Sequence, residues 1–276
     1  MKRLLLFALL SVLSTIPARA DLVLFDNGVG FGGCTTANCM SYTDLEGQGF
    51  GDHPRLLTLQ DNTYEQGMAQ PNGSGGVAYP TFPNPGAPGL TGANGAIQTG
   101  TDKASAPSLQ GLGWTTAAQV GIGFDSDQTG NSGITLQSLA LNLYQQAVGQ
   151  AAVTLIGTFP LSGAINFTQA ELALQPGNGN DAFTFVLDAT EQAAWNTLIT
   201  GVSLGQLFIG LSASAGCAGT VSQTCQVSND GPESFIAIAQ KGSPLFVPLP
   251  GAIWLFASGL AGLVTLSRRK RKSLTQ

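Results

Sequence analysis

The sequence contains little charge and almost no histidine. Only 10% of its 276 residues are charged, and His53 is its single histidine. Helix-forming Glu and Lys are therefore scarce, which disfavours a largely helical fold. No serine lies in the G-x-S-x-G turn that exposes a hydrolytic nucleophile, and the phosphate-loop pattern G-x-x-x-x-G-K-[ST] is missing. The composition thus gives little support to catalysis or to nucleotide binding.

Basic residues are nearly absent between the two ends of the chain. All 16 acidic residues lie between Asp21 and Glu233, whereas the basic residues of the middle are Arg55, Lys103 and Lys241. So acidic a region repels nucleic acid, and we expect no nucleic-acid partner. Solubility is the simplest consequence of this charge, and attraction of Ca²⁺ is the alternative.

The first twenty residues have the three parts of a secretory signal peptide. Lys2 and Arg3 precede the apolar stretch Leu4–Leu13, and Ala18-Arg19-Ala20 matches an A-x-A cleavage site. An uncleaved anchor helix is the alternative, but the apolar stretch is short and Pro17 interrupts it. The sequence therefore predicts a signal peptide at residues 1–20 and a mature chain that begins at Asp21.

The C-terminal end combines a proline-containing linker, an apolar segment and a basic cluster. Residues 241–250 form the predicted linker, 251–267 the predicted transmembrane helix and 268–276 a basic tail. Consecutive basic residues keep such a tail in the cytoplasm. We therefore predict a single-pass membrane precursor in the cell envelope, held by the cluster Arg268, Arg269, Lys270, Arg271 and Lys272.

The linker also carries a short motif, Val247, Pro248, Leu249, Pro250 and Gly251, ahead of the apolar segment. Together with Trp254-Leu255-Phe256 and the basic cluster, this motif resembles a PEP-CTERM sorting tail of the VPLPA-CTERM variant. Gly251 stands where the name of the variant has Ala, and both residues are small. The resemblance implies an exosortase as partner, processing at the motif, and release or relocation at the surface of bacteria that make exopolysaccharide. The prolines keep the motif extended, as a protease cleft requires.

The exported part, residues 21–240, alternates apolar and polar positions in several short runs bounded by Gly, Asn, Pro and Asp. A period of two predicts strands with one buried face. Eight or so short strands predict an all-β fold, a two-sheet sandwich that is jelly-roll-like, with a closed sheet as the alternative. The apolar positions are Leu22, Leu24, Leu57, Leu59, Val120, Ile122, Phe124, Leu139, Leu141, Leu143, Val153, Leu155, Phe183, Phe185, Leu187, Leu207, Ile209, Leu211, Ile236 and Ile238.

Two short helices are expected between these strands. Asp188 and Glu191 have the spacing of a capping box, with an apolar stripe after them and Gly201 at the end. Thr168 and Glu171 form a second such pair. Residues 71–100 are rich in Gly and Pro and predict a long irregular loop.

Four cysteines lie in the exported part: Cys34, Cys39, Cys217 and Cys225. An even number in an oxidising compartment favours disulfides. Among three possible pairings we favour Cys34–Cys39 and Cys217–Cys225, because each pair spans a short loop. A zinc site is the alternative, although the spacings fit it poorly.

Asp125, Asp127 and Asn131 place alternating oxygen donors in a loop between two predicted strands. Such donors beside a glycine turn could wrap Ca²⁺, the one cofactor that the sequence suggests. The same residues also make ordinary polar turns. For Trp114, Tyr79 and Tyr42 we favour core packing or loop anchoring, with stacking on a sugar as the alternative.

These observations lead to three functional hypotheses. The first is an exported, non-enzymatic protein of the cell surface or extracellular matrix, sorted by an exosortase and associated with exopolysaccharide or biofilm. The second is a carbohydrate- or calcium-binding surface adhesin. The third is a secreted polysaccharide hydrolase, which would need a carboxylate pair facing a cleft.

Overall fold

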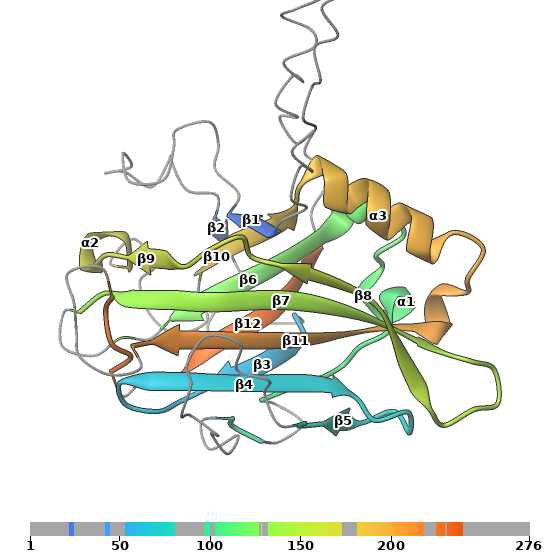
Figure 1. Ribbon diagram of the computed structural model, residues 1–276, viewed down its shortest axis with the longest axis horizontal. Coiled ribbons are helices and arrows are strands. Elements are labelled where there is room, and N and C mark those ends of the chain that lie inside the picture. Colours follow the sequence, from blue (N-terminus) through green and yellow to red (C-terminus); the bar gives the residue numbers. More distant parts are fainter. Residues whose placement is uncertain are drawn as a thin grey trace, which may run out of the picture. The chain divides into compact units, whose positions relative to one another are not determined.

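Strands dominate the computed structural model of this chain (Figure 1). It describes residues 22–24, 42–44, 53–80, 97–99, 103–126, 128, 132–172, 181–217, 225–229 and 231–239, all within the compact unit Met1–Ser243. The described strands form two antiparallel sheets, and the helices are few and short. The prediction of a mostly β fold with two sheets is therefore confirmed.

Each sheet has six described strands. The first sheet runs in the order β1 (Leu22–Leu24), β10 (Asp181–Leu187), β6 (Val120–Ser126), β12 (Glu233–Ala239) and β3 (Arg55–Leu59), and β2 (Tyr42–Asp44) also pairs with β10. The second sheet runs in the order β5 (Val77–Ala78), β4 (Tyr64–Pro71), β11 (Leu207–Gly216), β7 (Ile134–Gln146) and β8 (Val153–Pro160), and β9 (Ile165–Phe167) pairs with β7.

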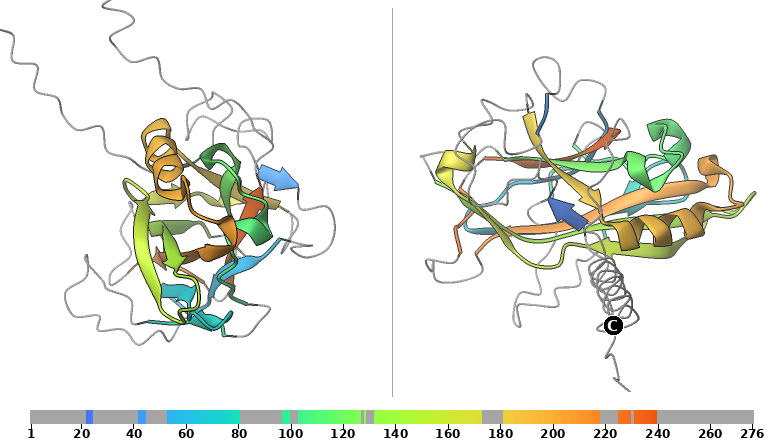
Figure 2. Two further views of the ribbon diagram at one scale, coloured as in Figure 1. Left: turned by 90° about the vertical axis from the view of Figure 1, so that its right-hand side faces the viewer. Right: turned by 90° about the horizontal axis from the view of Figure 1, so that it is seen from above.

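The two sheets form layers around a shared core, as the end view in Figure 2 shows. Inward-facing side chains from β6, β10 and β12 meet those of β9 from the second sheet. Phe124 lies 5.1 Å from Phe235 and 5.2 Å from Phe167, and Phe167 lies 4.6 Å from Phe183, all measured between ring centroids. These rings are fully or almost fully buried, so aromatic contacts join the layers.

The helices begin where the sequence predicts. In α3 (Ala189–Ile199) the side chain of Asp188 accepts a hydrogen bond from the Glu191 amide at 2.7 Å. In α2 (Gln169–Leu172) the Thr168 amide donates to the Glu171 carboxylate at 2.6 Å, and the Glu171 amide donates to the Thr168 hydroxyl at 3.3 Å. The capping box at Thr168 and Glu171 is confirmed, whereas at α3 only the Asp188 N-cap is, because the Glu191 carboxylate makes no hydrogen bond back to the cap. The remaining short helices are α1 (Leu109–Leu112), η1 (Ala117–Gln119) and η2 (Leu204–Gln206).

Helix α3 closes one side of the layered core by contacting β8 of one sheet and β10 of the other. Its Trp195 is fully buried and lies 5.1 Å from Phe159 of β8 and 6.3 Å from Trp114. Trp114 is fully buried as well. Trp114 is therefore a core residue, which confirms the favoured interpretation of core packing and excludes an exposed ring for sugar stacking.

Two predicted strand faces need correction. Leu155 of β8 is 49% exposed, because the register with β7 shifts between Leu143 and Tyr144 and reverses the alternation. In β12 the residues that enter the shared core are Phe235 and Ala237 rather than Ile236 and Ile238. The two isoleucines are also buried, on the opposite face of their sheet, so the periodicity alone could not select the core side.

None of the helices within the described ranges is long and apolar enough to cross a membrane. The predicted signal peptide (1–20), linker with its sorting motif (241–250), transmembrane helix (251–267) and basic tail (268–276) all lie outside those ranges.

Candidate functional site

The structure brings together two glutamates that are far apart in the sequence. Glu65 pairs with Ala215 of β11, whose side chain belongs to the core, so Glu65 points inward from the second sheet. Glu233 is the first residue of β12 and lies two positions before Phe235, so both side chains are on the same face of the strand. Glu233 therefore points inward from the first sheet. Their carboxyl groups meet between the sheets, close enough for each to shift the pKa of the other.

Both carboxyl groups are almost completely removed from water, with Glu65 1% and Glu233 0% exposed. Burial raises the pKa of Glu65 to about 7. Burial, reinforced by the neighbouring Glu65 carboxyl, raises the pKa of Glu233 well above its ordinary value. Two acidic groups in contact cannot both ionise without a compensating charge, so the pair favours a shared proton or a bound cation.

Polar neighbours hold the remaining oxygens of the pair. The Asp61 amide donates to Glu65 Oε2 at 3.1 Å. The Ser126 hydroxyl donates to Glu233 Oε1 at 3.3 Å, and Gln128 Nε2 donates to the same oxygen. One oxygen of each carboxyl group and the amide oxygen of Gln128 are buried without a hydrogen-bond donor from the described residues. The cluster therefore has more acceptors than donors.

The corner between β3 and β4 positions Glu65. Thr63 has a φ of 77°, which is costly for a β-branched residue. Three hydrogen bonds hold it there: its amide donates to the Ser228 carbonyl at 2.8 Å, and its carbonyl accepts from the Cys217 amide at 2.6 Å and the Ser228 amide at 3.2 Å. Gly216 must be glycine, because its φ is 77° and a Cβ would approach the Thr63 carbonyl oxygen to 2.2 Å.

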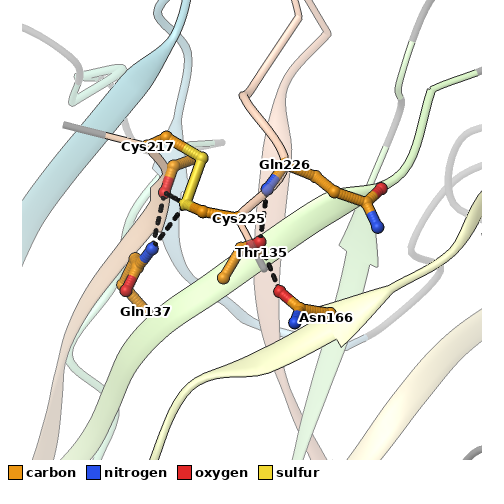
Figure 3. The surroundings of a disulfide bond; sticks show 7 residues. Thr135, Gln137, Asn166, Cys217, Cys225 and Gln226 are labelled. Atoms are coloured by element: carbon orange, nitrogen blue, oxygen red, sulfur yellow. Dashed lines mark hydrogen bonds between the residues drawn. A yellow bond between two sulfur atoms is a disulfide. The ribbon is translucent and has the colours of Figure 1, made fainter. Parts of the chain in front are cut away.

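A disulfide fixes the segment that supports this corner (Figure 3). Cys217 follows β11 and is bonded to Cys225, as predicted, and the Ser228 hydroxyl donates to the Asp61 carbonyl at 3.0 Å. Gln137 Nε2 donates to the Gly216 carbonyl at 3.0 Å beside the disulfide, and the Gln226 amide donates to the Thr135 hydroxyl at 2.7 Å. Cys34 and Cys39 lie outside the described residues.

The structure does not place the predicted calcium loop as a unit. Asp125 lies in β6, is 2% exposed, and occupies the face of the sheet opposite Phe124 and Ser126. Asp127 and Asn131 lie outside the described residues, so the calcium prediction for this loop stays a prediction. Within the described ranges, no three His, Cys, Asp or Glu side chains gather where they could hold a metal ion.

A surface pocket lies elsewhere, beside β5. It has a volume of about 410 Å³ and includes Tyr79, one of the aromatics for which sugar stacking is the alternative to core packing. The glutamate pair does not line this pocket, and its burial keeps it from facing a cleft. The other lining residues are Gly75, Gly76, Val77, Ala104, Ser105, Ala106 and Pro107.

In comparisons with known protein families, curated proteins and solved structures, nothing matches the chain.

Sequence analysis did not single out Glu65 or Glu233. Glu233 directly precedes the apolar run of β12, and Glu65 alternates with Gly67 and Ala69 in β4. A glutamate at the core-facing position of an alternating strand is the available signal, since charged residues are rarely buried alone. The alternation of β4 is weak, because its inward residues other than Glu65 are small.

Proposed function

We propose that this chain is an exported, non-enzymatic protein of the bacterial cell surface or extracellular matrix, sorted by an exosortase through Val247–Gly251 and associated with exopolysaccharide. The disulfide between Cys217 and Cys225 is the observation that carries the proposal, because such bonds persist in oxidising compartments outside the cytoplasm. The signal peptide and the sorting tail, both read from the sequence, agree with that compartment.

The buried position of the glutamate pair supports a non-enzymatic role. A glycosidase needs two carboxyl groups that flank the scissile bond of a bound sugar, with room between them for substrate or water. Glu65 and Glu233 instead contact each other between two sheets, and they are 1% and 0% exposed. This arrangement serves the fold or a small ion better than it serves a polysaccharide.

Export and sorting are tested by producing the full chain in a host with and without the matching exosortase. We expect the mature protein to lose both ends in the first host and to keep its C-terminal end in the membrane in the second. Intact mass and membrane fractionation give the readout. A Pro248→Ala, Pro250→Ala double variant should block processing, whereas Pro244→Ala, outside the motif, should not. Equal mass and location in both hosts would remove the sorting proposal.

Carbohydrate binding at the Tyr79 pocket is a second candidate. The pocket is open at the surface, and Tyr79 lines it while packing partly against the core, so a sugar would stack on whatever part of its ring the pocket exposes. A glycan array screened with the full chain should identify a ligand class. Tyr79→Ala should then abolish binding and Tyr79→Phe, which keeps the ring, should retain it. Equal binding by both variants would place the sugar elsewhere.

A further inference from the structure

The cluster around Glu65 and Glu233 contains three buried oxygens that lack a donor. They are Glu65 Oε1, Glu233 Oε2 and Gln128 Oε1, and no hydrogen-bond donor in the described part of the chain reaches them. Buried acceptors without donors are rare, because each loses its bonds to water on folding. Three such atoms from neighbouring side chains indicate that something outside the protein chain satisfies them.

A shared proton can satisfy only part of this cluster. One proton between the carboxyl groups would join one oxygen of Glu65 to one oxygen of Glu233. The amide oxygen of Gln128 would still have no donor, because the shared proton lies between the two carboxyl groups. The neighbours of the pair are Asp61, Ser126, Ser228 and Gln128, and among the described residues no basic side chain contributes charge to either glutamate. A positive charge from outside the chain would balance all three acceptors.

We propose that Glu65, Glu233 and Gln128 form a binding site for a divalent cation, Ca²⁺, between the start of β4 and the start of β12. The two carboxylates supply the charge, and the amide supplies a neutral oxygen ligand. The Ser126 hydroxyl, which already bonds to Glu233, lies close enough to the cluster to be a further oxygen ligand or to orient a water molecule. The site shares only Gln128 with the predicted calcium loop, because Glu65 and Glu233 come from the two sheets.

The donor set selects calcium over its competitors. All the atoms offered are oxygens, which suit hard cations and not zinc or copper. Ca²⁺ accepts irregular shells of about 6–8 oxygens, whereas Mg²⁺ requires a nearly ideal octahedron and usually keeps several waters. Gln128 is partly exposed, so water that reaches the cluster from its side would complete the irregular calcium shell beyond the protein oxygens. Gln128 also places the pair one side chain away from solvent, which gives an ion a route to the site.

The experiment uses the full chain purified in mild detergent, treated with EGTA and adjusted to pH 7.5. Calcium chloride is titrated by calorimetry, and thermal unfolding is followed with and without about 5 mM calcium, with magnesium in parallel. We expect a dissociation constant on the order of 10⁻⁴ to 10⁻³ M, as in extracellular calcium modules. We also expect calcium to raise the unfolding midpoint by about 5 °C, with a smaller effect of magnesium.

Glu-to-Gln variants of nearly equal volume test whether the calcium response comes from this site. Glu233→Gln and Glu65→Gln remove one charge each with little change of volume, and we expect both to lose the calcium response. Glu171→Gln is the control, since Glu171 is a buried glutamate 6% exposed at a helix start, where Gln caps equally well. We expect the control to respond as the unaltered protein does.

Two results would overturn the proposal. The first is an unaltered protein that shows neither binding heat nor a midpoint shift, which would leave the pair as a proton-sharing contact only. The second is a calcium response that survives Glu233→Gln or, if that variant does not fold, Glu65→Gln. Loss of the response in Asp127→Asn with its retention in Glu233→Gln would assign the ion to the loop instead. Because the proposal does not rest on export or sorting, its failure would leave the exosortase experiment unaffected, and the reverse also holds.

Discussion

The glutamate pair predicts an unusual dependence of stability on pH when calcium is removed. The pKa of Glu65 is about 7 in the folded protein and 4.5 as its ordinary value. A folded-state pKa that is raised means that the folded state binds the proton more tightly than the unfolded state does. Protonation therefore stabilises the fold, and this stability is lost as the pH rises through about 7. The pKa of Glu233 is shifted in the same direction by the same burial.

The expected magnitude follows from the size of the shift. With a pKa of about 7 in the folded state and 4.5 in the unfolded state, Glu65 contributes about 2 kcal/mol of stability at pH 5.5 and almost none at pH 8.5. For an unfolding slope near 2 kcal/mol per molar urea, the midpoint should fall by about 1 M over this range. Urea denaturation of the full chain in detergent with EGTA, followed by tryptophan fluorescence, measures the midpoint.

Glu65→Gln separates this effect from the general repulsion among the other acidic groups. The variant cannot ionise at this position, so its urea midpoint should depend less on pH than that of the unaltered protein. The variant should also be the more stable of the two at pH 8.5. The reasoning would be refuted if the urea midpoints of the two proteins changed equally with pH. It would also be refuted if the unaltered protein became more stable between pH 5.5 and 8.5.

Three further predictions concern the fold that holds the site. Gly216→Ala should lower the free energy of unfolding by more than about 2 kcal/mol, because it combines positive φ with a backbone clash; Gly113→Ala, with a φ of 69° and no atom within 4 Å of the added Cβ, should cost only about 1 kcal/mol. Replacing Cys217 and Cys225 together by serine should cost about 2–3 kcal/mol, and the unaltered protein should show the same loss after reduction. Phe124→Ala should cost about 3–5 kcal/mol by urea denaturation, since its ring is fully buried between two other phenylalanines. The glycine argument would be contradicted if both glycine variants lost the same free energy of unfolding. The disulfide argument would be contradicted if the reduced protein were as stable as the oxidised one. The core argument would be contradicted if Phe124→Ala lowered the free energy of unfolding by less than about 1 kcal/mol.

The sequence predicted the strands whose inward residues are large and apolar. In β7 and β11, Leu141 lies opposite Leu211 and Leu143 opposite Ile209, so the alternation in each strand matches the paired register. The sequence pattern did not predict strand β4, because Glu65, Gly67 and Ala69 lie on the core side of Tyr64–Pro71. A strand of this composition fits against bulky neighbours, and its own residues carry no apolar alternation.

The candidate site was less accessible to sequence reasoning than the fold. Helix N-caps and the Cys217–Cys225 disulfide are local, so the spacing of a few residues predicted them. The contact between Glu65 and Glu233 depends on the packing of two sheets, and no short-range pattern encodes it. Calcium was predicted in the loop after β6, and three of the buried acceptors without donors lie on Gln128 of that loop, on Glu65 of β4 and on Glu233 of β12.

The order of strands in the first sheet has a consequence for when the molecule can fold. β12 is the last described strand of the chain, yet it lies inside the sheet and is the strand through which β3 is joined to β6. During synthesis or translocation from the N-terminus, β3 therefore waits for residues 233–239 before this part of the sheet can assemble. Contacts over so long a separation form slowly. The polypeptide should consequently stay incompletely folded until almost all of residues 21–240 have been synthesised or translocated. Its β-sheets should then form in a late, cooperative step.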